Sequence, residues 1–536
     1  RSTPPLNENE LRNAVQSALK TGVPRELKIV KFQPGDVGAE LGNDTPDDSR
    51  PIVLLPGNGI EDRHTAVCLG RLLDATGRFY DRGGALVSLS RDDDGAPVLI
   101  QVKAAAVSTE FEEVAELRKI NKYNVEVHAI CYRATAERII TARVFLEALP
   151  AIHVISPVPV LIERDGELVQ ISDYDRESGV LAHGPSAPDM NLDEANSLLA
   201  ELIADYDFVT PSDRSRALAS VIVPALVMGD LLDGRAPLDL GEANQSQAGK
   251  GYRLKVGAAV YGRRVATVTQ RSGGVGSVEE SFSAHLIAGR TFISFDNLRG
   301  KFDIPAVESF MTEDSYIARV PYAVNVLIDA RRFLIMMTSN RAELTPDMAK
   351  RSSIIRINKQ SSGYAFRKYD EGDLLDHVRA NSRRFLGAVF AVVRAWYEAG
   401  KPRSNETGHD FRAWAQTLDW IVREVLGEAP LLEGHQAAKT RVATPHLTWL
   451  RDVTLEVAKN DRLDEPLRTH QLLDLLAAAE IEIPGVESGS DLDDKQTRNK
   501  ALRAMGGRLK RCFGQDTVEV DRFRIQRATF KDPEGR

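Results

Sequence analysis

Cysteine is scarce in this sequence of 536 residues: Cys68, Cys131 and Cys512 lie far apart and form no CxxC pair. Thiols so few and so widely spaced exclude a disulfide-rich scaffold and a zinc module built from paired cysteines. The ten histidines are also scattered, and no HExxH motif is present, which excludes that class of zinc peptidase. This cysteine usage is typical of a reducing compartment, so we expect a cytoplasmic protein.

Long apolar runs are missing as well. A membrane-spanning helix needs about 20 mostly apolar residues, whereas the best stretch, residues 217–228, is shorter and contains Pro224. We therefore expect no membrane partner. The 39 glycines and 25 prolines form no periodic pattern, which excludes collagen-like and low-complexity classes. The formal net charge of −8 excludes a uniformly basic surface but permits a local basic module.

What remains is the composition of a globular protein, with 43% hydrophobic and 27% charged residues. Short apolar strands alternate with helical patterns, and the length fits three or four domains at roughly 150 residues each, so we expect a multidomain α/β protein. Because the sequence begins with Arg1 and not with Met, we expect a fragment of a longer chain. The expected parts are an N-terminal segment and linker (1–50), an accessory α/β domain (51–190), a β/α core (191–365), a helical region (366–445) and a C-terminal domain (446–536).

The β/α core contains a glycine–lysine loop, NQSQAGKGY. A P-loop has the form GxxxxGK[ST]: backbone N–H groups wrap the phosphates, the lysine reaches the β and γ oxygens, and the hydroxyl binds Mg²⁺. Gly249 and Lys250 match, Asn244 can adopt the left-handed geometry of the first glycine, and Gly251 replaces the hydroxyl residue. The predicted ATP-binding residues are Asn244, Gln245, Ser246, Gln247, Ala248, Gly249, Lys250, Gly251 and Tyr252.

A second signal is the segment RTFISFDN, a buried strand that ends in Asp296. An aspartate at the carboxyl end of a parallel strand is typical of a Walker B motif, where it binds Mg²⁺. The alternative is an ordinary buried strand followed by a capping aspartate.

Two further signals follow in order along the chain. FLIMMTSN is another buried strand, ending in Asn340, and TPDMAKRSSIIRI predicts a short helix and a strand with Lys350 and Arg351 between them. The alternative for the basic pair is a surface helix end whose charges favour the helix dipole. The intervals from Lys250 to Asp296 to Asn340 each fit one or two β/α units, so the four signals together predict an ATPase site.

Residues 157–357 resemble the primase-helicase ATPases of phages, plasmids and integrative elements, which are related to the poxvirus-type primase-helicases of superfamily 3. The resemblance is carried by PVLIERDGELVQISDYDRESGV, YDFVTPSDRSRALASVIVPAL, ISFDNLRG and TSNRAELTPDMAKRSSIIRI. It implies an AAA+/superfamily 3-type P-loop ATPase core, ATP and Mg²⁺ as cofactors, and a homo-oligomeric ring, expected to be a hexamer.

The resemblance also implies residue roles. Asp296 would hold the metal, and Asn340 would orient the attacking water as the sensor 1 residue. Arg351, or with less support Lys350, would reach the nucleotide of the neighbouring subunit as an arginine finger.

The sequence departs from this pattern at two positions. Gly251 removes the metal-binding hydroxyl, and Asn297 stands where a catalytic glutamate usually follows the aspartate. A base could instead come from Glu279 or Glu280, on the predicted helix before the Walker B strand. Slow hydrolysis, or binding without turnover, therefore stays open.

A hairpin is predicted between the Walker B strand and Asn340, in TEDSYIARVPYAVNVLIDARRF. Superfamily 3 helicases carry a β-hairpin here that projects into the ring channel and grips DNA. The resemblance thus implies that Arg319 and Tyr322 contact single-stranded DNA. The alternative is a surface hairpin with solvated charges.

The C-terminal end is locally basic, with ten Lys and Arg against three Asp and Glu between residues 496 and 531. A helix, a basic helix and a two-stranded hairpin are predicted here, which is the order of a winged helix that binds duplex DNA. The alternative is a solvated helical face. The predicted DNA contacts are Arg498, Arg503, Arg508, Lys510, Arg511, Arg522 and Arg524.

The sequence as a whole favours an ATP-dependent DNA helicase or translocase ring that acts in the replication of a mobile genetic element or phage. Two alternatives stay open. One is a DNA-binding replication initiator or loader that uses its nucleotide as a switch. The other is a ring ATPase of a defence or remodelling system.

Overall fold

The computed structural model describes residues 50–243, 247–268, 276–296, 302–321, 323–340, 342–479, 481–486, 491–513, 517–520 and 523–527. The chain divides into two compact units, Arg1–Ile52 and Val53–Arg536. The elements considered below belong to the second unit, apart from β1 (Ile52–Leu54) at the boundary.

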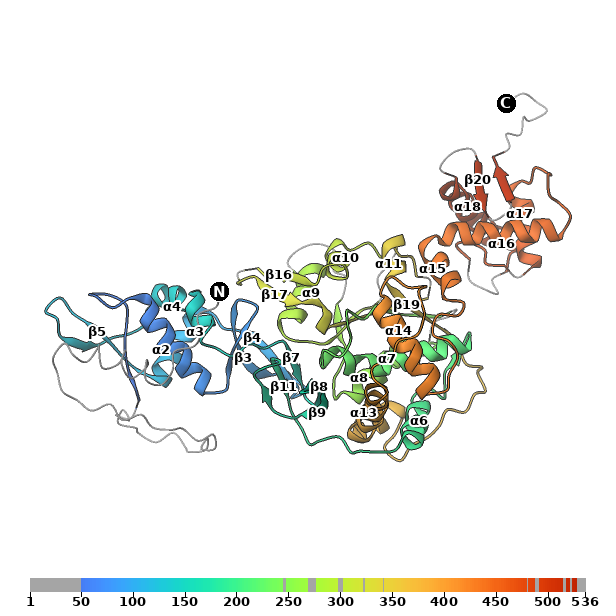
Figure 1. The fold of residues 1–536 in the computed structure, drawn as a ribbon. Helices are drawn as coiled ribbons and strands as arrows, with labels where there is room; N and C mark the ends of the chain where they lie inside the picture. The colour runs from blue at the N-terminus through green and yellow to red at the C-terminus, as the bar shows by residue number, and fades with distance from the viewer. Residues whose placement is uncertain are drawn as a thin grey trace, which may run out of the picture. The chain divides into compact units, whose positions relative to one another are not determined.

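The first part of the second unit mixes small, mainly antiparallel sheets with helices (Figure 1). Phe111 and Phe145 anchor a hydrophobic core between its helices. The elements are α2 (Asp62–Ala75), β2 (Phe79–Arg82), β3 (Ala85–Arg91), β4 (Pro97–Gln101), α3 (Ala104–Val114), β5 (Glu116–Ile120), β6 (Glu126–His128), α4 (Arg133–Ile140) and α5 (Arg143–Leu146). Five short strands follow: β7 (Val154–Ser156), β8 (Val160–Arg164), β9 (Glu167–Ile171), β10 (Tyr174–Asp175) and β11 (Val180–Ala182).

A six-stranded sheet forms the centre of the fold, in the order β12-β19-β13-β18-β15-β14. All strands are parallel except β12, which pairs antiparallel with β19 at one edge. Parallel strands covered on both faces read as continuous apolar runs, as in FISF and LIMM. The strands are β12 (Asp207–Phe208), β13 (Leu238–Ala243), β14 (Ala266–Val268), β15 (Phe292–Phe295), β18 (Leu334–Ser339) and β19 (Ser352–Asn358).

Helices cover this sheet, and α7, α8 and α13 pack on one another (Figure 1). The apolar run 217–228 lies in α7, which begins after the N-cap Thr210 and is buried along nearly its whole length. That run is therefore a core helix. The helices of this part are α6 (Leu192–Glu201), α7 (Pro211–Met228), α8 (Lys250–Val260), α9 (Val278–Ile287), α10 (Pro305–Phe310) and α11 (Pro346–Lys350). The hairpin β16 (Ser315–Ala318) and β17 (Val326–Asp329) precedes the 3-10 turn η1 (Ala330–Arg332).

The expected helical region is helical. It contains α12 (Leu374–Ala380), α13 (Ser382–Glu398), α14 (Arg412–Trp420), the π-helical turn η2 (Ile421–Val425) and α15 (His435–Ala443). Helix α13 is amphipathic, and its buried face, including Phe385 and Trp396, packs against α6 and α7.

The C-terminal module has a separate small core that includes Trp449, Leu473 and Met505. Its elements are α16 (Pro445–Lys459), α17 (Thr469–Ala478), α18 (Lys495–Cys512) and the antiparallel pair β20 (Thr517–Val520) and β21 (Phe523–Gln526). The predicted succession of helix, basic helix and hairpin is present, with α16 in front of it. Among the described residues, no helix is both long enough and apolar enough to span a bilayer.

Candidate functional site

Three neighbouring strands of the central sheet end at one edge, beside the residues that the motifs singled out. Strand β13 leads towards the glycine–lysine loop, β15 ends before Asp296, and β18 ends before Asn340. Strand β18 lies between the other two, with Thr338 opposite Gly241 and Met337 opposite Phe295. Because carboxyl ends of parallel strands share an edge, residues distant in sequence meet there.

The end of the glycine–lysine loop has the backbone geometry of a phosphate-binding turn. Gly249 caps α8 with a left-handed φ of 87°, and Lys250 is the first residue of the helix. A Cβ atom on residue 249 would lie 3.0 Å from the Tyr206 ring, so glycine is required both for conformation and for space. Gln247 is also left-handed, with φ 63°. Backbone N–H groups at such a helix start favour bound anions.

The remaining loop residues differ in role. Asn244, Gln245 and Ser246 lie outside the described residues. The hydroxyl of Tyr252 accepts a hydrogen bond from the backbone N–H of Leu375 (2.8 Å). Tyr252 therefore fixes α12 to α8.

Lys250, Asp296 and Asn340 come together as a polar cluster. The Lys250 Nζ donates to Asn340 Oδ1 at 2.6 Å. Thr338 Oγ1 donates to Asp296 Oδ1 at 2.7 Å, which orients the carboxylate. Burial lowers the pKa of Lys250, and the negative charges of Glu242 and Asp296 oppose that effect. The cluster thus holds a half-buried cation beside two carboxylates.

Glu242 is a member of this cluster that the motif analysis missed. It lies on β13, only 4% exposed, and both its oxygens accept from the guanidinium of Arg441 in α15. Burial lowers the pKa of Arg441, but hydrogen bonds to Glu242 and its charge outweigh this and hold it above the ordinary value. The sequence signal was a second acidic residue, after Asp239, in the strand segment LDLGEA directly before the loop.

The cluster fits a triphosphate with Mg²⁺. Mg²⁺ commonly takes only one or two protein carboxylates and completes its shell with phosphate oxygens and water. Asp296, held by Thr338, can supply that carboxylate. Within the described ranges, no group of three or more His, Cys, Asp and Glu side chains could hold a metal by itself.

Arg351 and Lys350 lie at the end of α11. The backbone oxygen of Arg351 accepts from Leu238 N at 3.0 Å, which ties this helix end to the start of β13. The Arg351 side chain is half-buried, and Lys350 is exposed, 3.8 Å from Asp347. In the described part of the chain, neither residue bonds to the cluster around Lys250.

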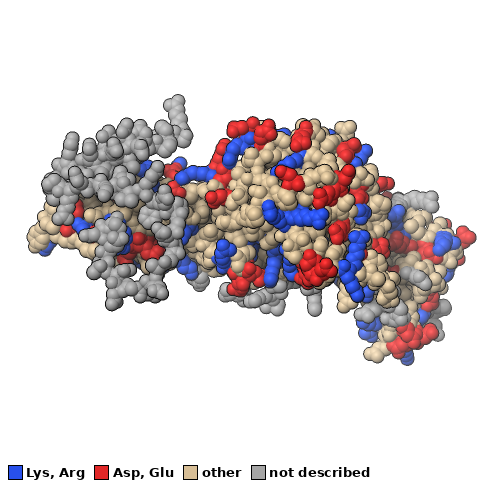
Figure 2. All heavy atoms as spheres, turned by 90° about the horizontal axis from the view of Figure 1, so that it is seen from below, with Lys and Arg blue, Asp and Glu red and all other residues tan. Residues whose placement is uncertain are grey.

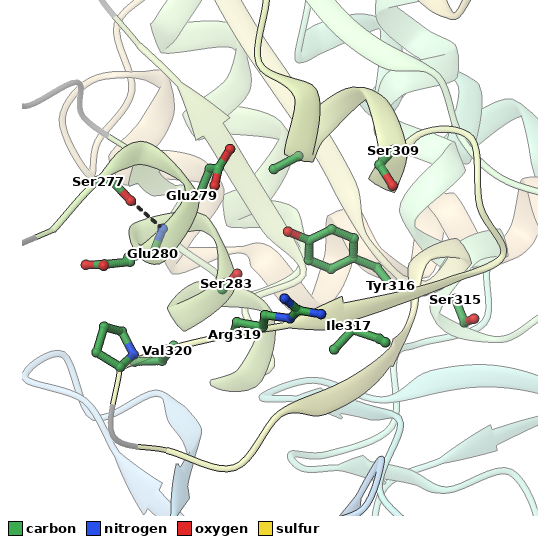
Figure 3. Close-up of a pocket in the computed structure, with 12 residues that line it drawn as sticks. Ser277, Glu279, Glu280, Ser283, Ser309, Ser315, Tyr316, Ile317, Arg319 and Val320 are labelled. Atoms are coloured by element: carbon green, nitrogen blue, oxygen red, sulfur yellow. Dashed lines mark hydrogen bonds between the residues drawn. The ribbon is translucent and has the colours of Figure 1, made fainter.

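Glu279 and Glu280 lie at a different hollow, a cavity of about 720 Å³ between α9, α10 and β16 (Figure 3). The Glu280 carboxylate accepts from Gly276 N at 2.8 Å, at the N-terminus of α9. Figure 3 shows the Tyr316 ring directed towards this helix. The lining contains Arg319 but none of Lys250, Asp296 and Asn340. The structure thus places the two glutamates at this cavity, and their role as a base stays a prediction.

The predicted hairpin is present as β16 and β17, with Ile317 opposite Leu327 and both exposed. Arg319 follows β16 and is exposed, whereas Tyr322 lies outside the described residues. The sequence did not reveal that the accessory part supports this hairpin. Leu327 N donates to Gly83 O at 2.9 Å, and Gln101 Nε2 donates to Val324 O at 3.0 Å.

Gly83 makes that contact possible. A Cβ on this residue would lie 1.9 Å from the Leu327 carbonyl oxygen, so the two chains can approach only with glycine there. The preceding Arg82 is buried and donates to Leu286 O at the end of α9 (2.7 Å). The turn between β2 and β3 is thus fixed to the core on both sides.

The basic residues of the C-terminal module divide into two groups. Arg508 points inward: it pairs with Glu482 (2.9 Å), donates to Pro445 O (3.2 Å) and stacks on Trp449. Arg498 and Arg524 pair with Asp474 and Glu519. Arg522 lies outside the described residues. The exposed basic residues of α18 are Lys495, Lys500, Arg503, Lys510 and Arg511.

Four of these exposed residues share one side of α18, because helical positions repeat every 3.6 residues. They are Lys500, Arg503, Lys510 and Arg511, and Gly507 lies among them with open space above it. On the face of the molecule drawn in Figure 2, basic and acidic side chains alternate. The uniformly basic side described above is therefore confined to α18.

The fold and this cluster define a mixed α/β protein whose central parallel sheet suits a P-loop nucleotide site. No protein-family profile matches the sequence, and no curated protein is similar to it. Several solved structures show weak similarity, and three of them are described next.

The apo structure of the NrS-1 C-terminal region is 13% identical, with a TM-score of 0.38 over 86% of this chain and 98% of that one. The SCCmec type IV Cch active helicase is 11% identical, with a TM-score of 0.31 over 80% and 88% of the two chains. The structure of JCV helicase bound to a small-molecule acetamide is 8% identical, with a TM-score of 0.24 over 47% of this chain and 65% of that one. At such low values, these likenesses establish neither a shared fold nor a shared activity.

Proposed function

We propose that this chain is an ATPase that acts on DNA, with its nucleotide bound at the carboxyl edge of the central sheet. The observation that carries the proposal is the meeting of Lys250, Asn340 and Asp296 at the ends of neighbouring parallel strands. A cation at a helix N-terminus and a nearby carboxylate are the groups that a Mg²⁺-bound triphosphate needs.

Each residue of the cluster has one task in this assignment. Lys250 and the first N–H groups of α8 bind phosphate oxygens. Asp296, oriented by Thr338, would hold Mg²⁺, which neutralises charge on the transferred phosphoryl group when bound. Asn340 orients the attacking water, and its bond to Lys250 positions both side chains in advance.

We also propose that the protein forms a ring of identical subunits, expected to be a hexamer. Arg351 is half-buried at the end of α11, and its backbone bonds to Met348 and Leu238 hold this position. An arginine placed in this way can complete the nucleotide site of a neighbouring subunit. The ring would then require contact between subunits for hydrolysis.

Two surfaces are proposed to contact DNA. The hairpin β16–β17 with Arg319 would grip a single strand in the ring channel, and the basic side of α18 would bind duplex phosphates. The activity would be helicase or translocase action in the replication of a mobile element or phage, a context that follows from the resemblance of residues 157–357.

The variant Lys250→Ala tests this proposal in two measurements, ATP binding and DNA-stimulated ATP hydrolysis. We expect the variant to lose ATP binding while its thermal unfolding stays that of the parent, because the charge of Lys250 is directed at phosphate. Lys255→Ala is the matched control, since Lys255 is exposed on the same helix. Unchanged ATP affinity in Lys250→Ala would show that the loop is not a phosphate site.

A nucleotide-switched initiator or loader is the second candidate, favoured by the sequence itself. Gly251 supplies no hydroxyl to the metal, and Asn297 supplies no base. A switch should bind ATP and change its DNA affinity, with little steady-state hydrolysis and no strand displacement on a forked duplex. A motor should show both activities, so the two assays separate the candidates.

A further inference from the structure

The ion pair between Glu242 and Arg441 joins two parts of the chain that the sequence gives no reason to connect. Glu242 is buried on β13, the strand before the phosphate loop, and Arg441 lies in the last turn of α15. Both guanidinium terminal nitrogens donate to the two carboxylate oxygens. Such a two-point pair fixes the orientation of both side chains and also neutralises the carboxylate charge.

Glu242 also acts on Lys250. Of the two carboxylates that favour the charged form of Lys250, Glu242 has the larger effect, ahead of Asp296. In the sheet register, Glu242 lies opposite Ser339, the residue before Asn340. The side-chain amide oxygen of Asn340 accepts a hydrogen bond from Lys250. The register thus places Glu242 beside the end of the strand that leads to Asn340, and Arg441 binds both of its carboxylate oxygens.

The helix that supplies Arg441 is attached to the site at a second point. Leu344 N, just past Asn340, donates to Val442 O at 2.9 Å. Thr444 ends α15 and also begins α16, the first helix of the C-terminal module. A displacement of α16 therefore reaches Arg441 without an intervening linker.

Stability alone does not explain this pair. Buried ion pairs are often no more stabilising than apolar residues of similar volume, because desolvation opposes the attraction. An arginine that occupies a carboxylate next to the phosphate lysine has a more specific consequence: it keeps that carboxylate from competing with the triphosphate for the lysine.

We propose that Arg441 is a positioning residue that holds Glu242 away from Lys250, and that the C-terminal module controls nucleotide binding by moving Arg441. With the pair intact, Lys250 is available to phosphate. When α15 shifts, Glu242 captures Lys250 and the site loses affinity for nucleotide. This inference rests on the proposed function, because it assumes that Lys250 binds phosphate.

The proposal assigns opposite effects to the two partners. Arg441→Ala should weaken ATP binding, by about tenfold within the 5- to 150-fold range of typical couplings, because Glu242 then competes for Lys250. Glu242→Gln should bind ATP more tightly than Arg441→Ala, because the charge that competes for Lys250 is gone. The double variant should regain parental affinity, since the competing charge is gone. Arg441→Lys should fall between, because lysine keeps the charge but not the two-point grip.

Coupling to the C-terminal module provides the second measurement. By linkage, DNA bound to this module must alter ATP affinity by the same factor by which ATP alters DNA affinity. We expect this reciprocal effect in the parent and its loss in the double variant, measured by fluorescence anisotropy of labelled duplex with and without a non-hydrolysable ATP analogue. Gln436→Ala, exposed on the same helix, is the control and should behave as the parent.

The outcomes separate the two levels of the proposal. If the parent binds no ATP, the proposed function fails and the inference fails with it. If the parent binds ATP and Arg441→Ala binds it equally well, or if the double variant is no better than Arg441→Ala, only the inference is overturned. Should Arg441→Ala fold poorly, the comparison of Arg441→Lys with Arg441→Lys/Glu242→Gln decides the same question, because both keep a cation at residue 441.

Discussion

Replacing Arg508 with alanine should destabilise the C-terminal module instead of removing a DNA contact. Arg508 is mostly enclosed, with 21% of its side chain exposed. It joins α18 to α16, through Pro445 O and Trp449, and to Glu482 in the segment between α17 and α18. Hydrogen bonds to charged groups contribute about 1.5–3 kcal/mol. A cation–π contact adds about 0.5–1 kcal/mol, and a partly exposed ion pair about 1 kcal/mol or less. Since these terms overlap in one side chain, we expect a loss of about 2–3 kcal/mol.

Hydrogen–deuterium exchange of the full chain is the appropriate assay, because it reports on α16 and α18 separately from the central sheet. We expect protection to fall in both helices of Arg508→Ala while the central strands stay unchanged. Arg511→Ala, exposed on the same helix, is the control and should keep its protection but bind duplex less tightly. Parental protection combined with a large loss of DNA affinity in Arg508→Ala would refute the inward assignment.

Three further outcomes are expected. Replacing Arg503 and Lys510 with glutamate should reduce duplex affinity. It should also flatten the dependence of this affinity on salt between about 50 and 200 mM, because fewer counterions are released on binding. An unchanged salt slope would argue against α18 as the DNA surface. Arg351→Ala should bind ATP without hydrolysing it. If neighbouring subunits share their sites, mixing this variant with Asp296→Ala protein should restore part of the activity. No recovery after confirmed subunit exchange would contradict an arginine that acts on the neighbouring subunit. Burial lowers the pKa of His409 to about 4, so its contribution to stability is complete above about pH 6.5 and is lost as the pH falls towards 4, because the unfolded chain protonates first. His409→Gln should flatten that decline in denaturant titrations, and an identical decline would exclude His409 as its source.

The sequence was most informative where a regular topology brings residues together. Asp296 and Asn340 each follow an apolar strand, and Lys250 follows the loop after β13. Parallel strands end at the same edge, so the order of the motifs was enough to predict that these residues meet. The helices and hairpin of the C-terminal module were likewise readable from periodicity and turn residues.

Contacts between distant surfaces could not be read in this way. Glu242 and Arg441 are 199 positions apart, and nothing in either local pattern indicates the other. From the sequence, Arg508 was indistinguishable from its exposed neighbours. Helical periodicity shows which residues share a side of a helix, but it does not show which side another part of the chain covers. Glu279 and Glu280 were singled out by their place before the Walker B strand, but the sequence did not indicate the cavity that they line with residues of β16.

The contact of Gly83 with Leu327 has a consequence for how the molecule can be divided. The segment that resembles known ATPases begins near residue 157, but the hairpin inside it is held by backbone and side-chain bonds from Gly83 and Gln101. A recombinant piece cut to that segment would lose two of the hairpin's anchors and would expose apolar residues of the sheet face beneath. A piece that keeps the hairpin anchored therefore starts before β2, and fluorophores placed on the β2–β3 turn and on the hairpin should keep a constant separation when nucleotide is added.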